Sequence, residues 1–488
     1  FLSLMVAGLP SRMLSRGEME AIHVRLVSNV TFFLGSLAGI GLLFLCLNMV
    51  VIVATVFLVH MTSLAEYSFG YYLFYLLTLN IPAWVIVAGF GTWTSFYTGS
   101  RILSIFLSVA WWLGCLFWLP YHFHGTLDYL GSGIPNLFSN LVGHVNLRLY
   151  LLQRAGWLLM GGGLLFLCVR RMMRLPNVDM VKRRLGGVGL LLVAAGGFSL
   201  CLVELDYFHS RSMRRGLRES FERYWSPFTC RVESHDIELE QRGGVLHSCS
   251  DMRVYNPNSE SLERLVFFLN PGLQVAGVSD GNEELPFQRE GHVLVVEREL
   301  GSGDTLSLRV KYSGEVDDVC CDLHLPDDEF EDVFHGDLFF PTGRRGAFVG
   351  DDLLLLTPAS MWYPVAFPPV NPLLPLATAR DFTRFHLLVK GEWQCELFSQ
   401  GVRLKDKSGV SFTCENALSG ISLYGGNLKR FTLAAGEVYN LQFGLTEWGK
   451  NFSRRLPCLQ QDSVVSFLNH TEENLKTIPE RAWYNQEE

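Results

Sequence analysis

Residues 185–203 read Leu-Gly-Gly-Val-Gly-Leu-Leu-Leu-Val-Ala-Ala-Gly-Gly-Phe-Ser-Leu-Cys-Leu-Val and contain no charged side chain. A helix needs roughly 20 apolar residues to cross the hydrocarbon core of a bilayer. Residues 1–205 carry only 18 charged side chains, whereas residues 206–488 carry the other 70. The first part is poorer in charge than a soluble domain, and the second part is ordinary. The sequence therefore predicts a membrane part followed by a soluble part.

Further charge-poor stretches precede this one. We predict five α-helical membrane spans in contact with the lipid bilayer, at residues 27–59, 71–97, 102–120, 150–169 and 185–204. The fourth span is long enough only if Arg154 extends its charged end to the interface. Small residues predict where helices pack closely, at Gly35 and Gly39, at 161–163 and at 194–197.

The net charge of −8 divides into +6 on residues 1–205 and −14 on residues 206–488. This distribution contains no basic stripe of the kind that binds nucleic acid. Basic residues of short loops favour the cytoplasm, and placing residue 1 there puts ten inside and only two outside, Arg148 and Arg154. Four basic residues disagree with this orientation, because they closely follow the last span: Arg211, Arg214, Arg215 and Arg218.

From about residue 228 the apolar period becomes two, as in antiparallel strands with one buried face. Leu306, Leu308, Val310 and Tyr312 alternate with polar residues, and turn signals such as Arg242-Gly243-Gly244 recur at short intervals. We predict an all-β sandwich or saddle domain over 228–446. Residues 206–227 are expected to be a linker, and 447–488 a helical C-terminal extension.

Motifs for catalysis are missing from this sequence. Residues 444–451 match the spacing of a nucleotide-binding loop, but Asn451 replaces the required Ser or Thr, and no His-Glu-x-x-His zinc motif occurs. The acidic segment 317–337 is either a solvated loop or a cation site, and we favour the loop. For His122 and His124, an interfacial aromatic belt is favoured over a metal pair. We assign no catalytic, cofactor-binding or metal residue, no cofactor in this chain, and predict that it is not an enzyme.

Two regions resemble known families. Residues 7–26, with Ala7-Gly8-Leu9-Pro10-Ser11-Arg12, and the outer segment Gly125-Thr-Leu-Asp-Tyr-Leu-Gly-Ser-Gly-Ile-Pro-Asn136 resemble type-2 ABC exporter permeases. The β domain resembles the N-terminal saddle domain of aminopeptidase-N-like (gluzincin) zinc peptidases. Its matching stretches are Phe267-Phe-Leu-Asn-Pro-Gly-Leu273, Trp362-Tyr-Pro364, Ser399-Gln-Gly401 and Ile421-Ser-Leu-Tyr-Gly-Gly426. Bacterial fusions of such a permease with such a peptidase look similar over nearly the whole chain.

The resemblance implies that a catalytic zinc domain would follow the saddle, but its motifs are absent from this chain. Residues 7–26 match the cytoplasmic coupling segment of the permease family, which follows earlier membrane spans. The resemblance therefore implies spans before this segment, so we expect an N-terminal portion before Phe1. At the position where the family binds the substrate's amine, this sequence has residues 354–360, Leu-Leu-Leu-Thr-Pro-Ala-Ser, without Gln or Glu.

The leading interpretation is a permease subunit of an ABC exporter in the bacterial inner membrane, with residues 27–205 forming the permease domain and an extracytoplasmic β domain binding substrate or a partner. ATP would act through a separate ATPase subunit, docked on the coupling segment 1–26 through Arg12, Arg16, Glu18 and Glu20. A second permease protomer or a homodimer is the expected membrane partner. The alternatives are a membrane-anchored peptidase or pseudopeptidase, and a structural component of a bacterial envelope machine.

Overall fold

The computed structural model describes residues 8, 29–62, 69–136, 138–139, 143–171, 179–281, 283–331, 343, 345–350, 353–373, 381–391, 393, 395–426, 428–435 and 440–445. The chain forms two compact units. The helical unit comprises Phe1–Arg211 together with Glu331–Arg344, and the β-rich unit comprises Ser212–Phe330 together with Arg345–Glu488. Nearly all of the coupling segment 1–26 and the whole extension 447–488 lie outside the described residues.

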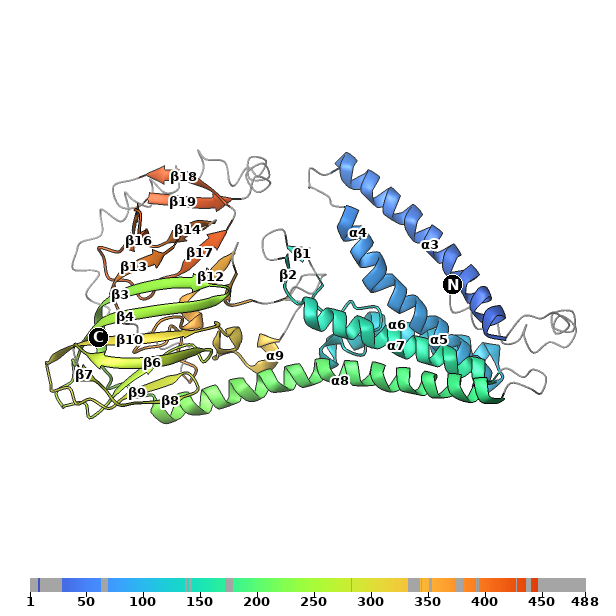
Figure 1. Ribbon diagram of the computed structural model, residues 1–488, viewed down its shortest axis with the longest axis horizontal. Coiled ribbons are helices and arrows are strands. Elements are labelled where there is room, and N and C mark those ends of the chain that lie inside the picture. Colours follow the sequence, from blue (N-terminus) through green and yellow to red (C-terminus); the bar gives the residue numbers. More distant parts are fainter. Residues whose placement is uncertain are drawn as a thin grey trace, which may run out of the picture. The chain divides into compact units, whose positions relative to one another are not determined.

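Long apolar helices make up most of the helical unit (Figure 1). Its helices are α3 (Asn29–Thr62), α4 (Phe69–Tyr75), the π-helix η1 (Leu76–Asn80), α5 (Ile81–Thr98), α6 (Arg101–Phe117), η2 (Leu119–Tyr121), η3 (Phe123–Gly125), α7 (Leu147–Arg171) and α8 (Asp179–Tyr224). A short hairpin pairs β1 (Phe138–Ser139) with β2 (Gly143–His144). Helix α8 continues to Tyr224 through most of the residues expected to form a linker, and its residues after Arg211 belong to the β-rich unit.

Four helical stretches are long and apolar enough to cross a membrane: Phe33–Val59, Phe69–Thr98, Leu147–Arg170 and Arg184–Tyr224. Helix α6, which matches the predicted third span, is shorter, with 17 residues. The coarse prediction of several apolar helices before a β-rich region is confirmed. The number of five spans is not established by helix length and composition.

Glycines let three pairs of helical segments approach closely. A Cβ at Gly161 of α7 would lie 2.6 Å from the backbone of Ile86 in α5, and a Cβ at Gly89 would lie 2.5 Å from the Gly161 carbonyl oxygen. Gly156 and Gly163 of α7 make similar contacts with Gly196 and Gly189 of α8. Small residues therefore mark packing at 161–163 and 194–197, as expected, whereas Gly35 and Gly39 have no described neighbour within 4 Å of an added Cβ.

The loop between α6 and β1 is organised by Asp128. Its buried carboxylate accepts hydrogen bonds from the backbone amides of Leu130, Ser132 and Gly133. Arg154 of α7 donates to the carbonyl oxygens of Asp128 and Tyr129, at 3.0 and 2.8 Å. The Arg154 side chain is buried in these contacts.

The β-rich unit contains an eight-stranded sheet in the order β15-β16-β13-β3-β4-β10-β6-β7, with β13 and β3 parallel (Figure 1). Its strands are β15 (Val402–Lys405), β16 (Gly409–Thr413), β13 (Arg384–Lys390), β3 (Arg231–Arg242), β4 (Val245–Tyr255), β10 (Thr305–Gly314), β6 (Leu273–Asp280) and β7 (Glu283–Glu284). Gly243 and Gly244 form the β3–β4 turn with φ of 57° and 84°, a backbone that favours glycine.

Three smaller sheets complete the unit, in the orders β11-β12-β17-β14, β5-β9-β8 and β18-β19. Their strands are β11 (Phe348–Val349), β12 (Leu354–Leu356), β17 (Leu423–Gly426), β14 (Glu396–Ser399), β5 (Leu265–Phe268), β9 (Val293–Val296), β8 (Phe287–Glu290), β18 (Lys429–Ala435) and β19 (Asn440–Leu445). Three short helices, η4 (Asp318–Cys320), α9 (Asp327–Phe330) and η5 (Pro358–Ser360), lie in the connections.

The core of the β-rich unit lies on one face of the eight-stranded sheet. Leu308, Val310 and Tyr312 of β10 are buried there, as their alternation predicts. They join one apolar cluster with Phe267 of β5 and Trp362. The other face of the sheet therefore carries the polar residues of the same strands.

Candidate functional site

The polar face of the eight-stranded sheet forms a regular array of side chains. The register across β13, β3, β4 and β10 aligns three rows, which are His386–Asp236–Asp251–Arg309, Leu388–Glu238–Cys249–Lys311 and Lys390–Glu240–His247–Ser313. Opposite charges pair within this array. Arg309 makes two hydrogen bonds to Asp251, at 2.5 and 2.8 Å, and Lys390 Nζ lies 2.5 Å from Glu238 Oε2. Such exposed pairs contribute little to stability, so they mainly fix where the charges lie.

A groove of about 320 Å³ is hollowed into this face. The residues that line it come from five adjacent strands: Glu238, Leu239, Glu240, His247, Ser248, Cys249, Ala276, Lys311, Tyr312, Ser313 and Lys390. Its volume is at the lower end of the range for small-molecule sites. The groove carries two carboxylates and two ammonium groups, and Lys311 takes part in no ion pair within the described residues. A ligand that carries both a positive and a negative charge is therefore complementary to the charges of the groove.

Two groups in the groove have shifted protonation equilibria. The hydrogen bond to Glu238 raises the pKa of Lys390 above its ordinary value, so this ammonium stays charged at neutral pH. Burial raises the pKa of the Cys249 thiol. Since the thiolate is the nucleophilic form, Cys249 is not activated for covalent chemistry.

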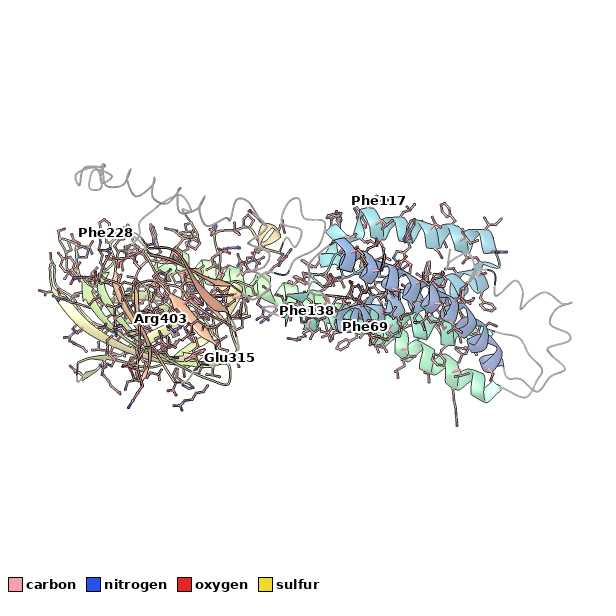
Figure 2. All side chains as sticks on the ribbon, turned by 90° about the horizontal axis from the view of Figure 1, so that it is seen from above. Phe69, Phe117, Phe138, Phe228, Glu315 and Arg403 are labelled. Carbon is pink, nitrogen blue, oxygen red and sulfur yellow. The ribbon has the colours of Figure 1, made fainter. Side chains whose placement is uncertain are left out.

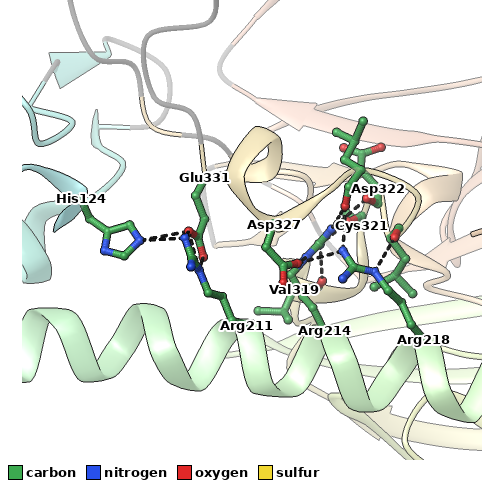
Figure 3. Close-up of polar contacts among 11 residues, drawn as sticks. His124, Arg211, Arg214, Arg218, Val319, Cys321, Asp322, Asp327 and Glu331 are labelled. Carbon is green, nitrogen blue, oxygen red and sulfur yellow. Dashed lines mark hydrogen bonds and ion pairs between the residues drawn. The ribbon is translucent and has the colours of Figure 1, made fainter. Parts of the chain in front are cut away.

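A second polar cluster holds the loop 317–327 of the β-rich unit to the end of α8 (Figure 3). Arg214 Nη1 donates to the carbonyl oxygens of Val319 and Cys321, at 3.0 and 2.8 Å. Its Nη2 donates to those of Asp322 and Leu325. This guanidinium therefore satisfies four backbone acceptors of one loop.

Arg218 completes the same cluster. It donates to the carbonyl oxygens of Leu323 and Leu325 and to Asp327 Oδ1, at 2.8, 2.7 and 2.8 Å. Burial raises the pKa of Asp327, but the hydrogen bonds and charges of Arg218 and Arg214 outweigh burial and hold it below its usual value. The cluster is a structural clamp for the loop.

The helical unit has its own charged cluster, around His124. His124 Nδ1 lies 3.0 Å from Glu204 Oε2, and His124 Nε2 lies 3.1 Å from Glu331 Oε2. The imidazole stacks on the Tyr207 ring, with 4.0 Å between the ring centroids. Arg211 Nε donates to the two carboxylate oxygens of Glu331, at 2.8 and 2.9 Å (Figure 3). Burial lowers the pKa of His124, but its hydrogen bonds to Glu204 and Glu331 outweigh burial and raise it to about 9. His124 is therefore a cation in an ion-pair network.

The structure places few of the residues singled out from the sequence in these clusters. Arg12, Arg16, Glu18 and Glu20 lie outside the described residues. Within the acidic segment 317–337, Asp327 and Glu331 bind arginines instead of solvent. No group of three or more metal-ligating side chains occurs in the described part of the chain. His124 belongs to an ion-pair network, whereas His122 stacks on Trp118 at 4.4 Å.

The groove residues were not found from the sequence. Alternation already placed Arg309 and Lys311 on the polar face of their strand. Their neighbours Glu238 and Lys390 come from strands far away in the chain, and only the sheet order joins them. The groove is therefore a property of the strand order.

Of the three comparisons with known proteins, the one with solved structures finds matches to this chain. No protein-family profile and no curated protein match the chain. An M1 zinc metallopeptidase mutant from Deinococcus radiodurans, bound to a Tyr-Ser-Ala substrate, is 18% identical over 44% of this chain and 46% of its own, with a TM-score of 0.33. Leukotriene A4 hydrolase from Saccharomyces cerevisiae is 12% identical over 46% of this chain and 35% of its own, with a TM-score of 0.29.

These neighbours belong to the zinc aminopeptidase class that the β-domain motifs resemble, and the exporter-permease resemblance is not shown by them. The chain spans less than half the length of either neighbour. The prediction that this chain is not an enzyme is corrected, because the structures similar to it are metallopeptidases. The described residues do not fit the zinc ion of that class, since they contain no suitable group of ligands, and we derive no catalytic step through zinc.

Proposed function

We propose that this chain is a membrane-anchored protein of the peptidase type whose β-rich unit binds peptides in the groove of the eight-stranded sheet. The observation that carries the proposal is the groove itself, with its carboxylates and ammonium groups set by the strand register. A short peptide is a zwitterion, so its amino and carboxyl ends find opposite charges there. The apolar helices of the same chain supply the membrane anchor.

Charge complementarity in this groove governs peptide specificity and orientation more than total affinity. The Glu238 and Glu240 carboxylates are suited to the peptide's amino group. The Lys311 ammonium, which has no ion pair in the described part of the chain, is suited to its carboxylate. These side chains project from strands whose backbone groups are already paired within the sheet. The side chains, and not an added strand, therefore provide recognition.

Isothermal titration calorimetry of the unlabelled peptide Tyr-Ser-Ala with the full chain in lipid nanodiscs tests the proposal. We expect saturable binding, and we expect the double reversal Glu238→Lys with Lys311→Glu to weaken it at least tenfold. The matched control is Arg253→Glu, which changes a charge on the same face that pairs with Glu233 and does not line the groove. Absence of saturable binding by the unaltered chain contradicts the proposal.

A permease role in an ABC exporter is the second candidate. The observation that favours it is the close glycine packing of α5 on α7 and of α7 on α8, because a simple anchor needs one helix and no packed bundle. In this role the chain pairs with a second protomer, and a separate ATPase binds near Arg12 and Arg16. Reversing both arginines to Glu should then abolish co-purification of an ATPase subunit while the chain stays folded.

The proposed location is the bacterial inner membrane, with the β-rich part outside the cytoplasm. The count of ten basic loop residues against two supports this orientation. Single cysteines at Asn177 and Asn282, in a background without native cysteines, should react with an impermeant maleimide from opposite sides of the membrane. Reaction of both from one side contradicts the orientation.

A further inference from the structure

Helix α6 buries its polar side chains and exposes its apolar ones. Ser104, Ser108 and Cys115 are buried. Ser104 Oγ donates to the Gly91 carbonyl oxygen at 2.7 Å and lies 2.8 Å from Thr94 Oγ1. Large apolar residues of the helix are exposed, namely Ile102, Leu103, Phe106, Val109, Trp112, Leu113, Leu116 and Phe117. The helix therefore has the reverse of the pattern found in a soluble protein.

Water is a poor solvent for this surface. Ile102 is 82% exposed, Phe106 67% and Phe117 75%, so most of each side chain has no protein neighbour within the described residues. Contiguous apolar patches of this kind are rare on soluble monomers. Buried Ser104 has already found its hydrogen-bond partners inside the unit. The exposed face thus matches hydrocarbon, which demands no hydrogen bonds.

The two ends of α6 carry the residues that favour a lipid headgroup layer. Arg101, at the N-terminal end, is exposed, and its guanidinium has the charge to pair with lipid phosphate. At the other end Phe117, labelled in Figure 2, is followed by the exposed aromatic residues Trp118, Tyr121 and Phe123. Aromatic residues with a polar edge gather at the membrane interface. Charge and aromatic residues therefore bracket an uncharged stretch.

Helix α6 is slightly shorter than the hydrocarbon core of a bilayer is thick. Seventeen residues rise about 25 Å along a helix, whereas the hydrocarbon core is about 30 Å thick. A short span is accommodated by thinning of the bilayer or by flanking side chains that extend to the interface. Helix α6 is shorter than each of the four stretches that meet the length for crossing.

We propose that α6 is itself a lipid-facing transmembrane helix, with Arg101 in one headgroup layer, Trp118 to Phe123 in the other, and acyl chains covering Ile102, Phe106 and Phe117. The bilayer is thinner beside this helix than around the longer ones. The inference is independent of peptide binding in the β-rich unit. A second copy of the chain is the competing occupant of the surface.

Accessibility of nitroxide spin labels to oxygen and to a water-soluble nickel complex distinguishes the occupants. The labels are placed at Phe106→Cys, at the buried control Ser104→Cys and at Phe228→Cys, an exposed position of the β-rich unit, with native cysteines replaced. In vesicles of phosphatidylcholine and phosphatidylglycerol, we expect the label at 106 to favour oxygen over nickel at least threefold. The label at 228 should show the reverse, and the label at 104 should be shielded from both.

Access of the nickel complex to the label at residue 106 would show that water covers this face of α6, which overturns the proposal. A label at 106 shielded from both reagents means a protein partner and also overturns it. The unaltered chain provides a second measurement that needs no cysteine replacement, namely photolabelling by a lipid with a diazirine in the middle of its acyl chain. Adducts on Phe106 support the proposal, and their absence while residues of α3 are labelled overturns it.

Discussion

Arg214 Nε lies 3.3 Å from Asp327 Oδ1, and the Arg214 side chain is completely shielded from solvent. The same guanidinium stacks over the Phe330 ring, with 3.6 Å from Cζ to the ring centroid. Together with its four backbone carbonyl partners, these contacts make Arg214 the residue that determines the path of the loop 317–327. A buried guanidinium is tolerated here because its hydrogen-bonding capacity is filled.

Replacing Arg214 with Ala should destabilise the β-rich unit by about 3–5 kcal/mol, the usual cost of removing one partner from a buried charged pair. The loop carbonyls lose their donors, and Asp327 keeps only Arg218. Thermal unfolding of the purified chain, followed by circular dichroism of the β-sheet signal, measures this loss. The control Arg223→Ala removes an exposed pair with Glu290 and should cost at most about 1 kcal/mol. Equal effects of the two substitutions would show that the clamp contributes nothing.

Local patterns were sufficient for the coarse architecture. Period-two alternation identified the buried residues of β10, and charge depletion identified the apolar helices. Residues 206–227 were expected to be a linker, and α8 runs through them as far as Tyr224. Arg214 and Arg218 in this stretch donate to backbone carbonyl groups of a loop about 100 residues later. Such long-range partners leave no periodic signal in the sequence.

His124 should make the stability of the helical unit depend on pH in the alkaline range. Its pKa is about 9 in the folded chain and about 6.5 when unfolded, so its contribution is complete below pH 6.5 and is lost as the pH rises through 9. His124→Gln should therefore lower the unfolding temperature at pH 6 and have a smaller effect at pH 10. The measurement is thermal unfolding in detergent at both pH values. A difference that does not shrink at pH 10 would refute the cationic state.

His235 should make the β-rich unit sensitive to acid. Burial lowers the pKa of this ring to about 3, so between pH 3 and 6.5 only the unfolded chain binds the proton. The free energy of unfolding then falls by up to about 1.4 kcal/mol per pH unit as the pH drops below 6.5. His235→Phe keeps a ring against Tyr363 and Phe385 and should flatten this dependence. Urea unfolding of the variant and of the unaltered chain at pH 7 and pH 5 tests it, and equal slopes for the two would contradict the role of His235.

His292 offers a second test of the same effect. Burial, and then the positive charge of Arg289, lower its pKa to about 3. The double variant His235→Phe with His292→Phe should lose less stability on acidification than either single variant. The His292 ring packs against Phe221 and Phe268 of one apolar cluster, and the His235 ring packs against Tyr363 and Phe385 of another. Their contributions should therefore add. Identical pH slopes for the double variant and the unaltered chain would exclude both histidines as the acid-sensitive groups.

Gly161 of α7 should be sensitive to the addition of a single methyl group. A Cβ there would lie 2.6 Å from the Ile86 Cα and backbone nitrogen, and backbone atoms of α5 cannot move aside as the end of a flexible side chain can. Gly161→Ala should therefore separate α5 from α7 and lower the unfolding temperature of the chain in detergent. The neighbouring Gly162 has nothing within 4 Å of an added Cβ. Gly162→Ala should then be neutral or stabilise the helix by about 0.5–1 kcal/mol, because Ala loses less backbone entropy. If the two substitutions shift the unfolding temperature alike, the close contact between α5 and α7 is not what holds the bundle together.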